Sequence, residues 1–123
     1  NSLLSFVSTK ISGADDYGKI IRDENGDVIC VVEKENLTEE QKKLDEINCG
    51  AYLMDLTWAR KNIPLIKKHY KNNSEYPLPD VIKMAIEQGE KVLGVMIDSS
   101  EWVGVNSPDQ LVQADKLMSS NNT

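Results

Sequence analysis

The chain has 123 residues, of which 40% are hydrophobic and 28% are charged, and its formal net charge is −6 at pH 7. This composition is typical of one globular domain and excludes a chain that is disordered along its whole length or collagen-like. The apolar runs hold only a few residues, whereas a membrane helix needs about 20. The acidic balance also argues against a nucleic-acid-binding module. We therefore expect no membrane and no nucleic acid as partners.

The two cysteines, Cys30 and Cys49, each lie inside an apolar run, where a reduced thiol packs as a small hydrophobic group. The sequence has no zinc-ligand spacing, and its single histidine is His69. A secretory signal consists of a basic stretch, an apolar core and a cleavage site, and the sequence does not contain this pattern. These features predict a reducing, cytoplasmic compartment.

The first predicted elements are strands. Strand character begins over residues 3–11, and two further runs, 19–23 and 28–33, are rich in β-branched side chains. The turn between these two runs contains Asn25 and Gly26, and Asn-Gly is the strongest short hairpin signal because both residues tolerate positive φ. We therefore predict an antiparallel β-hairpin.

The middle of the chain alternates helix starts with strand character. Thr38 and Gln41 form a capping box, which predicts a short surface helix. Residues 47–54 have strand character. Asp55 is placed to cap a helix that ends at Arg60.

Three more elements are predicted after a turn cluster at residues 72–74. Asp80 is expected to cap a helix that Gly89 ends, and its apolar stripe consists of Val81, Ile82, Ala85 and Ile86. Residues 91–97 are a predicted strand. A last helix has Ser107 as its cap, with Pro108 at the first position. Its predicted buried side consists of Leu111, Val112, Ala114, Leu117 and Met118.

The predicted fold class is α/β, with a mixed sheet, a β-hairpin and flanking helices, because strands and helices alternate and one strand pair is a tight hairpin. The usual catalytic motifs are absent: there is no nucleophile elbow, Walker loop or GxGxxG motif. Four residues stand out instead because they interrupt or end apolar runs, namely Gly18, Glu33, Asn48 and Asn106. Singly, each also fits a structural role at a turn, a strand end or a bulge.

The residues around these positions form ordered motifs. They are Tyr17-Gly18-Lys19-Ile20, Val32-Glu33-Lys34, Ile47-Asn48-Cys49-Gly50, Ser74-Glu75-Tyr76, Asp80-Val81-Ile82 and Gly104-Val105-Asn106. In this order they resemble the sugar nucleotidyltransferases, and most of all the pyrophosphorylase (uridyltransferase) domain of the bacterial N-acetylglucosamine-1-phosphate uridyltransferases. The resemblance covers residues 3–118.

The resemblance implies a partial Rossmann-like nucleotidyltransferase fold and a reaction. A sugar 1-phosphate attacks a nucleoside triphosphate, expected to be UTP; pyrophosphate leaves and a nucleotide sugar such as UDP-N-acetylglucosamine forms. By position, Gly18 would set its backbone against the sugar, Glu33 would accept from sugar hydroxyls and Asn48 would hold the sugar or its acyl group. Asn106 would bind Mg²⁺ through its amide oxygen, a hard ligand. No catalytic side chain is implied.

Two departures from the family pattern bear on these expectations. Where the uridyltransferases have a tyrosine, an aliphatic residue and a threonine, this chain has Pro77, Leu78 and Pro79. The family's Gly-rich nucleotide-binding loop and its metal-binding aspartate are not found in these 123 residues. Residues 1–118 therefore correspond to the sugar-phosphate-binding half of the domain, followed by a polar tail at 119–123.

An isolated half is expected to be inactive, or nearly so, without the N-terminal half as partner. It is also expected to self-associate through an exposed sheet edge. The alternative that remains open is a non-catalytic module, derived from the same fold, that binds a nucleotide sugar or another protein.

Overall fold

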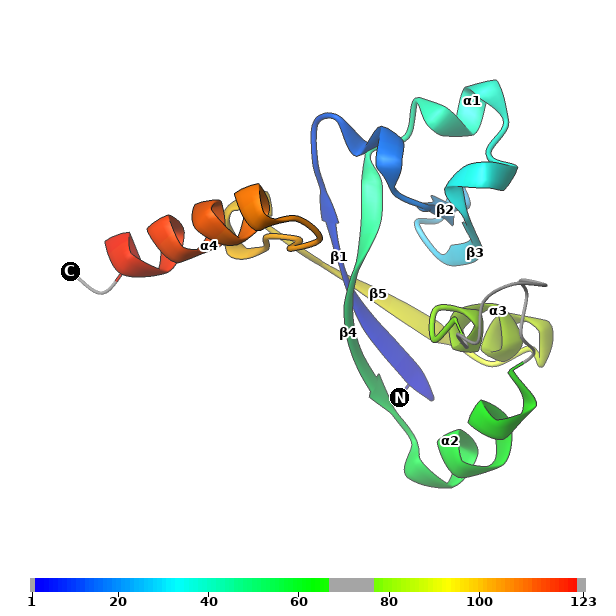
Figure 1. The fold of residues 1–123 in the computed structure, drawn as a ribbon. Helices are drawn as coiled ribbons and strands as arrows, with labels where there is room; N and C mark the ends of the chain where they lie inside the picture. The colour runs from blue at the N-terminus through cyan, green and yellow to red at the C-terminus, as the bar shows by residue number, and fades with distance from the viewer. Residues whose placement is uncertain (1, 67–76, 122–123) are drawn as a thin grey trace.

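The computed structural model describes residues 2–66 and 77–121, and it contains two separate β-sheets (Figure 1). The strands are β1 (Leu4–Lys10), β2 (Lys19–Arg22), β3 (Val28–Val32), β4 (Glu46–Met54) and β5 (Val92–Ile97). The α-helices are α1 (Glu39–Lys42), α2 (Leu56–Asn62), α3 (Asp80–Glu87) and α4 (Pro108–Asn121). Short 3-10 helices are η1 (Ala14–Asp16), η2 (Lys34–Asn36), η3 (Ile63–Leu65) and η4 (Ser99–Glu101).

The larger sheet has three strands in the order β4-β1-β5. Strand β1 pairs antiparallel with β4 and parallel with β5, so the sheet is mixed. The second sheet is the hairpin β2-β3, in which Ile20 lies opposite Val31. The predicted α/β class, with a mixed sheet, a hairpin and flanking helices, is confirmed.

The hairpin turn forms where its sequence predicts. Gly26 has φ of 83°, a value that glycine adopts without the cost that a side chain would bring. The Asp23 carboxylate accepts the backbone N–H groups of Asn25 and Asp27 at 2.9 and 3.0 Å. Local side-chain bonds therefore fix the turn, and the turn fixes the register of the two strands.

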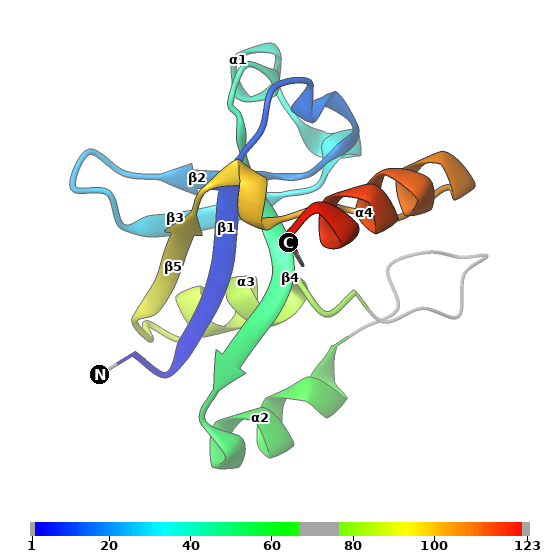
Figure 2. The ribbon, with the colours of Figure 1, turned by 90° about the vertical axis from the view of Figure 1, so that its left-hand side faces the viewer.

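The hydrophobic core lies on one side of the larger sheet, under α3. Leu4 and Phe6 are buried on β1, and the predicted stripe of α3 packs against them through Val81, Ile82 and Ala85. Figure 2 shows the opposite side of this sheet, with α3 behind the strands. The strands of one sheet thus have a covered face and a face turned away from the core.

The helix starts agree with the sequence except at α3. The Thr38 capping box on α1 is confirmed, and the Asp55 carboxylate caps α2 by accepting the Trp58 N–H at 2.7 Å. Asp80 does not cap α3: the cap position is Pro79, whose φ of −54° and ψ of −20° are already helical, so Asp80 falls in the first turn. Gly89, with φ of 75°, ends α3 as predicted.

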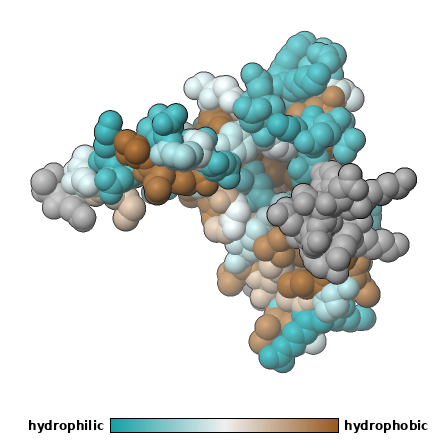
Figure 3. All heavy atoms as spheres, viewed as in Figure 1, coloured by the Kyte–Doolittle hydropathy of each residue, from teal (hydrophilic) through white to brown (hydrophobic). Residues whose placement is uncertain are grey.

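The prediction that α4 has a buried side is wrong. Figure 1 shows α4 projecting from the sheet on the side opposite α3, and Figure 3 shows apolar side chains on its surface. Leu111, Val112, Leu117 and Met118 are all at least half exposed, and only Ala114 is half-buried. The helix also continues beyond Met118 to Asn121, because the serines that follow do not break a helix. An amphipathic pattern shows that a helix has an apolar face, not that this chain covers it.

Some expectations fall outside the described residues. They are the turn cluster at residues 72–74, the motif Ser74-Glu75-Tyr76 and the single histidine, His69.

Candidate functional site

A cavity of about 130 Å³ brings together three of the four residues singled out from the sequence. Its lining residues are Tyr17, Gly18, Val31, Glu33, Asn48 and Pro79. They come from the entry to β2, the end of β3, the bulged part of β4 and the start of α3. Gly18, Glu33 and Asn48 are far apart in the sequence, and the hairpin brings them together around one cavity. Asn106 does not line this cavity.

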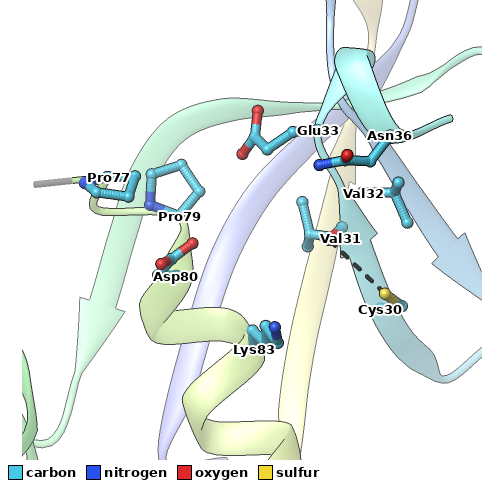
Figure 4. Close-up of a pocket in the computed structure, with 9 residues that line it drawn as sticks. All are labelled: Cys30, Val31, Val32, Glu33, Asn36, Pro77, Pro79, Asp80 and Lys83. Atoms are coloured by element: carbon cyan, nitrogen blue, oxygen red, sulfur yellow. Dashed lines mark hydrogen bonds between the residues drawn. The ribbon is translucent and has the colours of Figure 1, made fainter. Parts of the chain in front are cut away.

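A larger cavity of about 520 Å³ adjoins the first and shares Val31, Glu33 and Pro79 with it. Its lining also includes Cys30, Val32, Asn36, Pro77, Asp80 and Lys83. Figure 4 shows Glu33 extending from the end of β3 across the cavity toward Pro79, with Asp80 and Lys83 of α3 on the far wall. The larger cavity has a size typical of small-molecule sites, and its lining has charged side chains of both signs.

The backbone at Gly18 lies very close to the end of β3. A Cβ atom on Gly18 would lie 2.9 Å from the Val32 carbonyl oxygen and 3.3 Å from Glu33 Cα. Both neighbours are backbone atoms, so they cannot move aside without shifting the strand. Glycine at this position therefore lets the entry to β2 approach Glu33, and it sets the distance between the two lining residues.

A β-bulge orients the side chain of Asn48. The β1–β4 register shifts between Phe6 and Ser8, and Gly50 in the bulge has φ of 82°. The Gly50 N–H donates to Asn48 Oδ1 at 2.9 Å, and Asn48 Nδ2 donates to the Tyr52 hydroxyl at 2.5 Å. Asn48 therefore has the structural role at a bulge that its sequence allows, and it also lines the cavity.

The Tyr52 hydroxyl accepts a hydrogen bond from Asn48, and the Glu33 carboxylate affects the pKa of Tyr52. Burial raises the pKa of the Tyr52 phenol, the hydrogen bond from Asn48 opposes this rise, and the nearby Glu33 carboxylate adds to it. A ligand hydroxyl that enters the cavity meets a carboxylate acceptor and an amide held in one orientation.

A partly buried ion pair attaches the hairpin to the larger sheet. Arg22 donates to Glu46 through Nε at 2.8 Å and Nη2 at 2.7 Å, and Nη2 also donates to the Gly94 carbonyl at 3.0 Å. The Ser8 hydroxyl donates to the same Glu46 carboxylate at 2.7 Å. This network joins β2 to β4, β1 and β5, so it fixes the position of Gly18 and Glu33 relative to Asn48.

The segment that leads to Asn106 packs beside the cavity. The rings of Tyr17 and Trp102 meet edge to face with centroids 5.9 Å apart, and Trp102 Nε1 donates to the Cys49 carbonyl at 3.2 Å. A Cβ on Gly104 would lie 3.1 Å from the Tyr17 hydroxyl. Asn106 follows two residues later, is exposed, and its backbone N–H donates to Gln110. Trp102 is not among the residues that the sequence singles out, because nothing local signals a ring contact with a residue so distant in the chain.

Asn106 can supply one amide oxygen to a cation. Within residues 2–66 and 77–121, no group of three or more His, Cys, Asp and Glu side chains is placed to hold a metal ion. Mg²⁺ commonly takes few protein ligands and completes its shell with water and substrate phosphates. Asn106 is exposed and follows Gly104, which packs against the cavity-lining Tyr17, and this fits that mode of binding.

Both cysteines are free thiols, as expected, and burial raises the pKa of Cys49. In the part of the chain that the structure describes, no helix has both the length and the apolar character needed to cross a membrane.

The site joins a strand-end carboxylate, a close-approach glycine and a bulge amide on a mixed α/β scaffold. The sequence profile of the nucleotidyl transferase family matches residues 1–121, and the chain belongs to that family.

Several curated relatives of this chain carry the name "Bifunctional protein GlmU". The protein of Thermoanaerobacter pseudethanolicus is 35% identical over 115 residues, which cover 94% of this chain and 25% of that protein. The protein of Clostridium novyi is 38% identical over 102 residues, which cover 83% of this chain and 22% of that protein. The protein of Caldanaerobacter subterraneus is 39% identical over 102 residues, with the same two shares. The chain therefore spans about a quarter of the length of these relatives.

Proposed function

We propose that this chain supplies the sugar-binding part of a nucleotidyltransferase that makes a nucleotide sugar. The observation that carries the proposal is the single cavity lined by Gly18, Glu33 and Asn48. Membership of the nucleotidyl transferase family and similarity to GlmU support a sugar 1-phosphate and UTP as the substrates.

The proposed reaction is a direct transfer. An oxygen of the sugar 1-phosphate attacks the α-phosphorus of UTP, the bond from that phosphorus to the bridging oxygen breaks, and pyrophosphate leaves with the electron pair. Such a transfer depends on positioning and charge neutralisation more than on a protein nucleophile. Glu33 would accept hydrogen bonds from sugar hydroxyls, and Asn48 would bind the sugar or its acyl substituent through its remaining N–H and lone pair.

Asn106 is the proposed Mg²⁺ ligand in this reaction. When bound, the ion would neutralise phosphate charge, and the remaining ligands would come from the substrates, water or other residues of the whole protein. The packing of Gly104 against Tyr17, which lines the cavity, supports this role because it keeps the segment beside the bound sugar.

Binding of N-acetylglucosamine 1-phosphate tests the sugar site directly. We expect saturable shifts of the amide resonances of Gly18, Glu33 and Asn48 in an NMR titration of the chain. The Glu33→Gln variant should weaken binding about tenfold, because it replaces charge-assisted hydrogen bonds with neutral ones. The matched control is Glu35→Gln, since Glu35 is exposed and lines neither of these cavities. Equal affinities of the two variants would contradict the role of Glu33.

The metal role is tested by turnover in the natural protein that carries this chain. Pyrophosphate release from UTP and the sugar 1-phosphate should fall in Asn106→Ala, and more Mg²⁺ should be needed for half-maximal rate. Gln113→Ala, on the exposed surface of α4, is the control. An unchanged rate and Mg²⁺ dependence in Asn106→Ala would refute the ligand assignment. Sugar binding without turnover would favour the non-catalytic module instead.

We further propose that the uncovered face of the β4-β1-β5 sheet packs against another part of the nucleotidyltransferase domain. Leu53, Leu93 and Val95 are exposed on this face, and an apolar cavity of about 280 Å³ lies over it. Exposed apolar patches of this kind mark interfaces. The chain alone should therefore self-associate in sedimentation, whereas a monomer at every concentration would contradict this.

A further inference from the structure

A fourth cavity, of about 210 Å³, is lined by a different set of residues from the candidate sugar site. Its lining residues are Asp15, Lys19, Lys34, Leu37 and Lys42, and none of them lines the two cavities around Glu33. They come from η1, β2, η2, the segment that follows η2, and α1. The volume is several times the roughly 30 Å³ of one water molecule, so it admits a small polyatomic ligand.

Lys19 forms the buried part of this cavity. Its side chain is fully buried, and its ammonium group donates a hydrogen bond to the Ala14 carbonyl. Within the described residues no carboxylate forms an ion pair with it. Burial lowers the pKa of Lys19, and the more distant charges of Asp15 and Asp45 only oppose that effect. A buried ammonium group with unused N–H donors is costly unless an anion compensates it.

The other two lysines are free to turn toward a ligand. Lys34 pairs with Asp16 at 3.6 Å and Lys42 pairs with Glu39 at 2.6 Å, and both acidic side chains are almost entirely exposed. Exposed pairs of this kind contribute little to stability, so an anion in the cavity can compete for the lysines.

The charge of the lining differs in sign from that of the molecule. The lining has three lysines and one aspartate, whereas the whole chain has a net charge of −6. We propose that this cavity binds a small phosphate-type oxyanion, with Lys19 at its closed end and Lys34 and Lys42 at its rim. Ammonium groups from three separate elements would then converge on one ligand, which is the arrangement that multiply charged oxyanions need.

The test is an NMR titration of the chain with inorganic phosphate against sodium chloride at the same ionic strength. We expect saturable shifts of the amides of Asp15, Lys34, Leu37 and Lys42 with phosphate and none with chloride. Parallel titrations with pyrophosphate decide which oxyanion fits better. Shifts confined to Gly18, Glu33 and Asn48 would overturn the proposal and leave the sugar site standing.

Variants separate a specific site from general attraction. Lys19→Met keeps the length and apolar stem of the side chain and should weaken phosphate binding about tenfold or more, as the loss of one charge-assisted hydrogen bond does. Lys42→Gln changes an exposed side chain and should weaken binding without affecting folding, which keeps the test decisive if Lys19→Met unfolds. The control is Lys116→Met, an exposed lysine on α4. Equal loss of affinity in Lys42→Gln and Lys116→Met, or no loss in either, would overturn the proposal.

Discussion

The two faces of the β4-β1-β5 sheet are built from alternate residues of the same strands, yet two leucines on opposite faces differ sharply in burial. Leu4, on the face under α3, is 0% exposed, whereas Leu53, on the other face, is 75% exposed. The register places Leu53 opposite Ser5, the residue next to Leu4. The comparison shows that strand alternation decides which residues share a face, while burial depends on what covers that face.

The two faces of the sheet also have different proposed roles. The candidate sugar cavity lies on the covered side, between the hairpin and α3 (Figure 4). The proposed interface with the rest of the domain lies on the uncovered side. Substitutions on the two faces should therefore affect different measurements.

The largest expected effect comes from shortening the same residue type on each face. Leu4→Ala removes a fully buried side chain and should lower the free energy of unfolding by about 3 kcal/mol. Leu53→Ala should change it by about 0.5 kcal/mol or less, since the side chain is already in water. Urea unfolding of the two variants measures this, and similar losses would contradict the proposed difference between the faces.

The next effect concerns the ion pair that attaches the hairpin to the covered side. Glu46→Gln keeps the shape of the side chain but removes the charge that Arg22 and Ser8 contact. We expect a loss of about 2 kcal/mol in the free energy of unfolding, because a partly buried guanidinium group loses its counter-charge. Urea unfolding at neutral pH measures this, with Glu40→Gln on α1 as the exposed control.

The same pair predicts a pH dependence. Burial would raise the pKa of Glu46, but the hydrogen bonds from Arg22 and Ser8 outweigh it, and the pKa lies below its ordinary value of 4.5. A lowered folded-state pKa stabilises the protein above pH 4.5, and this stability is lost as the pH falls through the lowered value. The difference in the free energy of unfolding between the parent chain and Glu46→Gln should therefore shrink in acid. A difference that stays constant with pH would contradict the lowered pKa of Glu46.

A smaller effect is expected at the entry to the hairpin. Gly18→Ala would place a Cβ 2.9 Å from the Val32 carbonyl oxygen, so the end of β3 must shift. We expect a loss of about 1–2 kcal/mol in stability, typical of overpacking, and weaker binding of the sugar phosphate because Glu33 moves with the strand. Calorimetric titration measures the binding, and full affinity in Gly18→Ala would show that the close approach does not position Glu33.

The smallest effect on stability is expected on α4. Met118→Gln exchanges an exposed apolar side chain for a polar one, so the free energy of unfolding should change by about 0.5 kcal/mol or less. Self-association in sedimentation should decrease if the apolar side of α4 belongs to the proposed interface. A large loss of stability would instead mean that α4 packs within the chain.

Local chemistry explains what could be predicted from the sequence. Asn25 and Gly26 set the hairpin, Thr38 and Gln41 set the start of α1, and Gly89 ends α3, because each signal acts between neighbouring residues. Of the four residues singled out from the ordered motifs, Gly18, Glu33 and Asn48 line one cavity, whereas Asn106 does not. The roles of these three residues remain predictions.

Features that depend on distant contacts were not predicted. The Arg22–Glu46 pair and the contact between Tyr17 and Trp102 join residues with no local signal. The apolar stripe of α4 predicted burial, but nothing within the described residues covers that stripe. Asp80 has the chemistry of a helix cap, yet the backbone is already helical at Pro79. Pro79 therefore occupies the cap position, and Asp80 lies in the first turn.

The bulge in β4 has a consequence for selectivity. The Asn48 Oδ1 accepts from the Gly50 N–H, so a half-turn of the amide would set its NH₂ group against that donor and lose this bond. The Tyr52 hydroxyl can bond to either end of the amide, so the Gly50 N–H alone sets the orientation. The polarity that the amide presents to the cavity is fixed before any ligand arrives. A sugar substituent whose donor and acceptor were exchanged would set its donor against the Asn48 N–H and its acceptor against the Asn48 oxygen. The fixed amide would therefore disfavour one of two isomers that both fit the volume of the cavity.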